Sequence, residues 1–159
     1  MYSIPLTAED DFEGWRTAAR RLAMADVPPS HVSWQVGGET TNLFGEDRPL
    51  PLEAAGFGVP RDFLDLARSV ALHRDPERFS LLYALLLRLR DQPRLLDDQA
   101  DPLVRRAEAL AKAVRRDMHK MHAFVRFREV ADGDGTRFVA WFEPDHYIVR
   151  ANAGFFVRR

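Results

Sequence analysis

Cysteine is absent from the 159-residue chain, and lysine is scarce, since only Lys112 and Lys120 occur among the 23 basic residues. Without cysteine the chain itself can form no disulfide, thiolate zinc site or iron–sulfur cluster, and such a composition is typical of a cytoplasmic protein. No apolar run approaches the roughly 20 residues that a helix needs to span a bilayer. The acidic N-terminal segment MYSIPLTAEDDFEGW lacks the basic and apolar regions of a signal peptide. These absences predict a protein without disulfides that does not cross a membrane.

Catalytic signatures are missing as well. The sequence contains no phosphate-binding glycine loop, no P-loop and no nucleophile elbow. A composition of 46% hydrophobic and 30% charged residues is that of a globular protein, and its length suits one domain. The sequence therefore predicts a folded domain without predicting a reaction or a cofactor.

The charge is unevenly distributed, although its net value is only −1. Residues 1–60 hold four arginines against nine acidic residues, whereas residues 104–159 hold twelve basic residues against seven acidic ones. The two segments carry −5 and +5, and the segment between them is close to neutral. Because surface potential follows the distribution of charge, the C-terminal third is expected to attract anions.

Hydrophobic periodicity and turn residues predict a helix-rich α+β fold. Asp75-Pro76 and Asp101-Pro102 are typical helix starts, and ADGDGT is typical of a hairpin turn. The chain opens in a βαβ-like order, followed by a long loop at 37–58. We expect a single domain with a small antiparallel sheet that includes a hairpin at 123–143. The expected strands are 2–6, 31–36, 123–130 and 137–143, and the expected helices are 12–25, 61–73, 76–90, 102–121 and 145–159.

Three local features refine this prediction. Thr7 and Asp10 resemble a capping box for the first helix, and Asp145 is expected to cap the last one. The leucine-rich helix at 76–90 is apolar on nearly every side, which places it at the centre of the core. Tyr83 on that helix is therefore expected to be a core residue and not a catalytic phenol.

The helix at 102–121 is expected to bury one face and to present a cationic stripe on the other. Residues 104–128 contain eight arginines and lysines against two acidic residues, a clustering typical of nucleic-acid-binding surfaces. On a helical wheel the stripe consists of Arg105, Arg106, Lys112, Arg115, Arg116, His119 and Lys120.

The hairpin is expected to continue this surface. Its alternating pattern places Val125 and Phe127 with Phe138, Ala140 and Phe142 on one face. The other face then carries guanidinium groups beside an indole, a platform suited to phosphate contact and base stacking. That face consists of Arg126, Arg128, Val139 and Trp141.

A structural interpretation of the same residues is also open. Arginine-rich helix faces are often simply solvated, and Arg128 could pair with Glu129 or Glu143. Arg126 could equally neutralise an acidic residue of the N-terminal segment. Ion pairs of this kind would remove the basis for a nucleic-acid surface.

The histidines offer two weaker alternatives. His119 and His122 are spaced for metal binding, with His146 or Glu143 as a third donor, but the wheel does not make them converge, and we expect no metal site. His119, Glu143 and His146 could instead serve an enzyme as an acid–base set in a polar pocket.

Four stretches resemble the family known as domain of unknown function 4130: DFEGWR at 11–16, and residues 59–90, 111–130 and 137–159. The motifs RRDxHKMxAFVRFRE and FVAWFEPxHxI carry most of this resemblance. It implies a role in DNA metabolism or DNA repair. Family members occur beside a radical-SAM protein or fused ahead of a family-4-type uracil-DNA glycosylase domain, which are the partners that the resemblance implies.

The resemblance also sets limits. The family pattern continues past FFVRR with a tryptophan-containing strand and a TPxxSAxWDG-like segment, so the chain is expected to be a fragment of a longer protein. Uracil excision would belong to a separate domain and is not carried over. The leading expectation is an accessory DNA-binding domain, and the alternatives are an enzyme acting on DNA or a docking module for the glycosylase or radical-SAM partner.

Overall fold

The computed structural model describes residues 1–37, 48–52 and 56–158. Within these residues the chain forms five α-helices and four short strands, which confirms the expected helix-rich α+β fold with a small antiparallel sheet. Most of the loop predicted at 37–58 lies outside the described residues. No helix in the described part of the chain is long and apolar enough to cross a membrane.

The chain opens with a parallel βαβ unit, as expected from its sequence. β1 (Tyr2–Leu6) pairs in parallel with β2 (Val32–Val36), with Tyr2 opposite Val32 and Leu6 opposite Val36. A parallel pair needs a crossover connection, which α1 (Phe12–Met24) provides before the 3-10 turn at Pro29–His31. The apolar residues at helical spacing are buried as expected, namely Phe12, Trp15, Ala18, Ala19 and Leu22.

The capping box predicted at Thr7 is wrong. α1 begins at Phe12, and its N-cap is Asp11, whose carboxylate accepts hydrogen bonds from the Gly14 N–H at 2.9 Å and the Thr7 N–H at 3.0 Å. Partial burial acts to raise the pKa of Asp11, but these hydrogen bonds lower it overall. The Thr7 hydroxyl donates to the same carboxylate at 2.9 Å, so Thr7 supports the cap residue and is not the cap.

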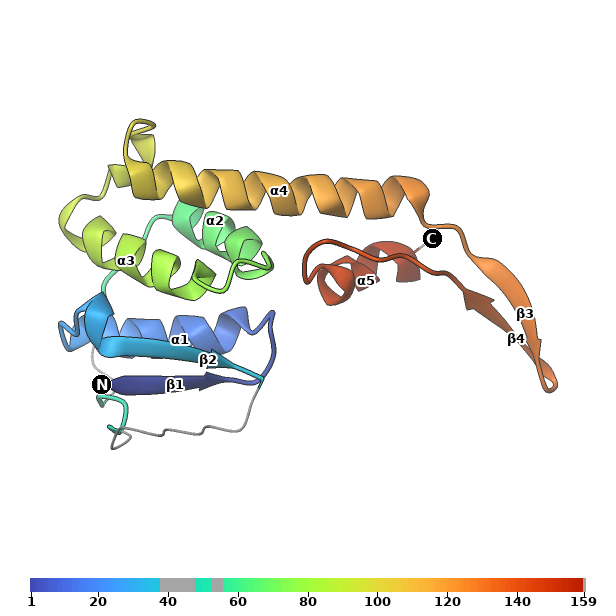
Figure 1. Cartoon of the computed structure of the whole chain (residues 1–159), viewed down its shortest axis with the longest axis horizontal. Helices are drawn as coiled ribbons and strands as arrows, with labels where there is room; N and C mark the ends of the chain where they lie inside the picture. The colour runs from blue at the N-terminus through green and yellow to red at the C-terminus, as the bar shows by residue number, and fades with distance from the viewer. Residues whose placement is uncertain (38–47, 53–55, 159) are drawn as a thin grey trace.

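Three helices build the main core. α2 (Arg61–Ala71), α3 (Arg78–Asp91) and α4 (Pro102–Phe124) pack together, with α1 and the strand pair on the other side of α3 (Figure 1). The central position of α3 is confirmed, because its apolar side chains are buried on nearly every side. Tyr83 is fully buried, and its hydroxyl donates to the Val27 carbonyl at 2.7 Å. This burial confirms the expected core role of Tyr83, and it raises the pKa of the phenol.

Asp101 fixes the start of α4, as expected from the Asp-Pro pair. One carboxylate oxygen accepts from the Leu103 N–H at 3.0 Å and the Val104 N–H at 3.2 Å. Arg88 of α3 donates two hydrogen bonds to the same carboxylate, at 3.0 and 2.6 Å. The hydrogen bonds from Arg88 hold the pKa of Asp101 below its usual value. The cap therefore also links α4 to the central helix.

A second, smaller hydrophobic cluster lies under the C-terminal half of α4. Val114 and Met121 of α4 pack there with Ile148, which immediately precedes α5 (Val149–Val157). The predicted start of this helix at Asp145 is wrong. The His146 N–H donates to Asp117 at 2.8 Å and the Tyr147 N–H to the Leu72 carbonyl at 2.9 Å. These contacts hold the segment before the helix, and α5 begins only after Ile148, its N-cap residue.

The hairpin projects from the body as an exposed arm, which we define as residues 125–143. β3 (Arg128–Asp132) and β4 (Gly135–Val139) form its antiparallel ladder, beyond the end of α4 (Figure 1). Every residue of both strands is exposed. The end of α4, the arm and α5 therefore form a C-terminal part that extends away from the main core.

Candidate nucleic-acid interface

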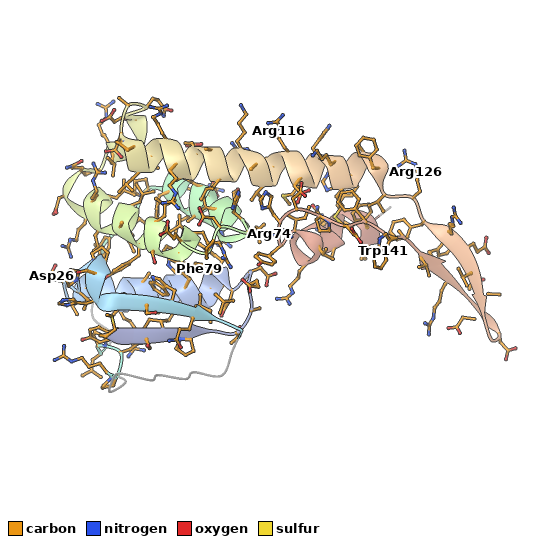
Figure 2. All side chains as sticks on the ribbon, in the orientation of Figure 1. Asp26, Arg74, Phe79, Arg116, Arg126 and Trp141 are labelled. Atoms are coloured by element: carbon orange, nitrogen blue, oxygen red, sulfur yellow. The ribbon has the colours of Figure 1, made fainter. Side chains whose placement is uncertain are left out.

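The cationic stripe of α4 faces solvent. Apolar residues recur at helical spacing on the inner face, where Val104, Ala107, Ala111 and Val114 are fully buried. Figure 2 shows Arg116 projecting from the side of α4 that faces away from α2 and α3. The predicted stripe residues on that side are all exposed, namely Arg105, Lys112, Arg115, Arg116, His119 and Lys120.

These stripe cations have no acidic partner within the described residues. The two acidic residues of α4 do not compensate them: Asp117 is buried and binds the His146 backbone, and Glu108 forms no ion pair within the described residues. A shallow hollow of about 350 Å³ lies over the C-terminal half of the stripe. Its walls are Lys112, Arg115, Arg116, His119 and Lys120. The stripe is thus a concentrated positive surface without internal neutralisation.

Arg106 differs from the other residues of the predicted stripe. Its guanidinium donates to Asp75 at 2.9 Å and to Glu77 at 2.7 Å, in the turn before α3. Partial burial acts to raise the pKa of Asp75, but the hydrogen bond from Arg106 and other contacts lower it overall. Arg106 is therefore a tie between α4 and the α3 turn and not part of the free stripe.

α4 runs further than its sequence pattern predicted. The strand predicted from residue 123 is wrong at its start, because Ala123 and Phe124 remain helical and the Val125 N–H bonds to the Met121 carbonyl at 3.1 Å. No glycine or proline interrupts this segment, so the helix continues until Val125 adopts an extended conformation. The ladder then begins at Arg128 and ends at Val139, so residues 140–143 lie outside it.

The predicted register of the hairpin is confirmed. Arg128 lies opposite Val139, and Val130 lies opposite Arg137, so these four side chains share one face. Arg126 and Trp141 lie near the junction between α4 and the arm (Figure 2). All four residues predicted to group together line one hollow of about 420 Å³, namely Arg126, Arg128, Val139 and Trp141.

The two arginines of this hollow can contact a ligand. Arg126 donates to the Ala123 and Val125 carbonyls at 2.8 and 2.9 Å, where it complements the C-terminal end of α4. Neither Arg126 nor Arg128 forms an ion pair with an acidic residue in the described part of the chain. The pairing of Arg128 with Glu129 or Glu143 is therefore not seen. Trp141 leaves 83% of its surface exposed, an unusual environment for an indole.

The other face of the arm is only partly covered. Val125 is buried and Phe142 is half-buried, but Phe127 and Phe138 keep 49% and 67% of their surfaces exposed. The predicted grouping of apolar residues on this face therefore does not make it a buried face. The paired strands instead lie beyond the end of α4, where the body has no surface to cover them (Figure 1).

His119, His122 and His146 do not form a common site. His122 bonds to the Asn152 amide oxygen at 2.9 Å and stacks on Phe155 with ring centroids 3.8 Å apart, so it joins α4 to α5. His119 lies on the exposed stripe, whereas the His146 backbone is bound to Asp117 on the inner face. No group of three metal-binding side chains occurs within the described residues. The structure likewise does not bring His119, Glu143 and His146 together as an acid–base set.

A histidine pair was missed from the sequence. The rings of His73 and His146 lie 4.0 Å apart, and each Nδ1 accepts a backbone N–H, from Asp75 at 2.9 Å and from Arg74 at 3.1 Å. Burial and the neighbouring His146 lower the pKa of His73. Nothing in a single sequence links residues so far apart. The pair holds the segment before α5 against the end of α2.

Fold and surface together define a helix-rich α+β protein with a solvent-facing cationic helix that leads into an exposed arm. The chain belongs to the family described as domain of unknown function DUF4130, which matches residues 76–159. The match includes α3, α4, the arm and α5, whereas the resemblance at 11–16 and 59–75 lies outside it. No curated protein and no solved structure is similar enough to match.

Proposed function

We propose that this protein binds DNA through one continuous surface, as an accessory domain in DNA repair or DNA metabolism. We call this the cationic surface; it consists of Arg105, Lys112, Arg115, Arg116, His119, Lys120, Arg126, Arg128 and Trp141. The observation that carries the proposal is the lack of acidic partners for its arginines and lysines within the described residues. Unpaired cations along a rigid helix are available to replace the counterions of a phosphate backbone.

The distribution of charge supports an oriented complex. The segment before residue 61 carries −5 and the segment after residue 103 carries +5, so the two ends would respond oppositely to a polyanion. The acidic N-terminal unit would be repelled while α4 and the arm are attracted. The link to DNA repair and the expectation of a cytoplasmic location rest on the family resemblance and the composition.

The test is a double substitution in the stripe. We expect Arg115→Ala with Arg116→Ala to weaken DNA binding to a similar extent for all sequences, because phosphate contacts carry no sequence information. The slope of log Kobs against log salt should shrink by about two, roughly one for each contact removed. Fluorescence anisotropy with labelled DNA at several salt concentrations measures both quantities.

A matched control removes the same charge elsewhere. Arg16 and Arg68 are exposed arginines outside the cationic surface, and both pair with Glu13 at 3.3 Å. Arg16→Ala with Arg68→Ala should leave affinity and slope nearly unchanged. Equal effects of the two double variants would mean that net charge, and not the cationic surface, determines binding.

A docking module remains the second candidate function. Its support is a set of exposed apolar side chains on the end of α4, the arm and α5: Phe124, Phe138 and Val157 are exposed by 70%, 67% and 83%. In this function the glycosylase or radical-SAM partner would cover these side chains. Absence of DNA binding at low salt, with retained binding to such a partner, would favour it.

A further inference from the structure

We infer that the preferred ligand is DNA with an unpaired nucleotide, whose backbone lies along α4 and whose exposed base enters the hollow at the base of the arm. This inference rests on the proposed function and names its substrate class. Two separate features carry it: the different chemistry of the two hollows, and the acidic tip of the arm.

The stripe on α4 suits a backbone and not a base. Its hollow is lined only by cationic and histidine side chains and offers no aromatic or apolar surface for a base. From Arg105 to Lys120 the helix rises about 22 Å. That length corresponds to about six nucleotides of one strand. α4 therefore presents a row of phosphate contacts along a straight line (Figure 1).

The hollow on the arm has the chemistry of a base site. Trp141 offers an indole that is 83% exposed, and Val139 adds an apolar wall that is 52% exposed. Arg126 and Arg128 line the same hollow, whose volume is about 420 Å³. That volume lies within the roughly 300–1,000 Å³ of small-molecule sites. An aromatic ring flanked by cations binds a stacked base and its phosphate together.

The tip of the arm argues against insertion into a duplex groove. A two-stranded ribbon can enter the major groove, and its paired strands would then contact the bases. The residues between 129 and 137 include Glu129, Asp132 and Asp134, whereas their one arginine, Arg137, is paired with Asp132. Such an acidic tip is repelled by phosphates, so contact is confined to the base of the arm.

An intact duplex cannot satisfy this arrangement. Base faces in a duplex are covered by their neighbours, and an indole can stack only on a base that has left the stack. Single-stranded DNA, or a duplex with an unpaired nucleotide, presents such a base without the cost of unpairing. The strand would run along α4 and turn its free base onto Trp141, near the junction of α4 and the arm (Figure 2).

The experiment compares three labelled DNAs of equal length: single-stranded DNA, an intact duplex, and a duplex with one central unpaired thymine. We expect the third to bind about 5- to 150-fold more tightly than the intact duplex, the range of one stacking contact. Trp141→Ala should abolish this preference, so that the unpaired-thymine duplex and the intact duplex bind with equal affinity. Trp141→Phe should retain much of the preference, because an aromatic ring remains.

The control is Phe138→Ala, which removes an aromatic side chain that is 67% exposed on the opposite face of the arm. It should leave the preference intact. Tryptophan fluorescence gives a second readout, since Trp15 is buried and packs against Trp34, whereas Trp141 is open to contact. Quenching by the unpaired-thymine duplex should disappear in Trp141→Phe.

The outcomes separate the two claims. Equal affinity for the intact and the unpaired duplex, or a preference that survives Trp141→Ala, would overturn the inference while salt-dependent binding through the stripe stands. Absence of binding to all three DNAs at low salt would overturn the proposed function itself.

Discussion

At the scale of single residues, the Arg78 guanidinium shows how charge is used inside this protein. The side chain is only 2% exposed, yet each of its three nitrogens donates a hydrogen bond. It donates to the carbonyls of Ala71, Asp75 and Glu9 at 3.0, 3.0 and 2.7 Å, and to the Glu9 carboxylate at 2.8 Å. One residue of α3 thereby joins the end of α2 to the loop before α1. Its pairing contrasts with the unpaired cations of α4.

We expect Arg78→Ala to lower the free energy of unfolding by roughly 3–5 kcal/mol, because it leaves buried carbonyl groups without donors. Urea unfolding followed by circular dichroism measures the change. The matched control is Arg68→Ala, which removes an exposed arginine and should cost less than about 1 kcal/mol. Equal losses in the two variants would contradict a structural role for Arg78.

The neighbouring rings of His73 and His146 predict a pH dependence of stability. Burial lowers the pKa of His73 in the folded protein below the ordinary value of 6.5. The unfolded chain therefore binds a proton at His73 more readily than the folded protein does. The contribution of neutral His73 to the free energy of unfolding is complete above pH 6.5, and it is lost as the pH falls from 6.5 through the pKa of the folded state. His146, Asp75 and Arg78 are the titratable and charged groups that act on this pKa.

His73→Asn retains an acceptor for the Asp75 N–H but cannot titrate. We expect it to flatten the decline in unfolding free energy between about pH 7 and pH 5, relative to the unchanged protein. Urea midpoints measured across this range provide the comparison, and His31→Asn, at an exposed histidine, serves as the control. The same dependence of unfolding free energy on pH in all three proteins would rule out a contribution from the titration of His73.

At the scale of elements, the turn of the arm depends on one glycine. Asp132 and Gly135 are paired at the end of the ladder and enclose a two-residue turn, Gly133-Asp134. Gly133 has a φ of 60°. Such a turn requires a left-handed conformation at that position, which favours glycine. The hairpin ladder is otherwise held by its own strands, since no residue of either strand is buried.

Gly133→Val should destabilise the arm by roughly 1–2 kcal/mol, the cost of placing a side chain in a left-handed conformation. Amide hydrogen exchange of residues 128–139 should accelerate, while the thermal midpoint of the whole protein stays the same. Gly135→Ala is the control, because an added Cβ meets only the Asp132 carbonyl, at an ordinary 3.6 Å. Unchanged amide exchange in Gly133→Val would show that the turn does not determine the stability of the arm.

The elements differ in how far their sequences predict them. Asp101-Pro102 and the leucine pattern of α3 act locally, so the start of α4 and the burial of Tyr83 followed from sequence alone. The end of α4 did not, because no local signal separates Ala123 and Phe124 from the strand that follows. The pairing of Arg106 with Asp75 joins residues far apart in the chain, and only the fold shows which stripe cations stay unpaired.

At the scale of the whole molecule, α4 connects two differently charged parts. Its first half covers the main core on the side of α2 and α3 away from α1, and its second half covers the small cluster beside α5 and leads into the arm (Figure 1). A single helix therefore sets the orientation of the stripe relative to the main core. The protein should approach a polyanion with α4 and the arm leading.

The salt dependence of DNA binding tests the central claim most directly. Fluorescence anisotropy of the unchanged protein with labelled single-stranded and duplex DNA, between about 50 and 200 mM salt, gives the slope of log Kobs. The cationic surface contains seven arginines and lysines, so we predict a steep negative slope that reaches about −6 if each contacts one phosphate. No binding at the lowest salt, or binding that does not change with salt, would contradict the account.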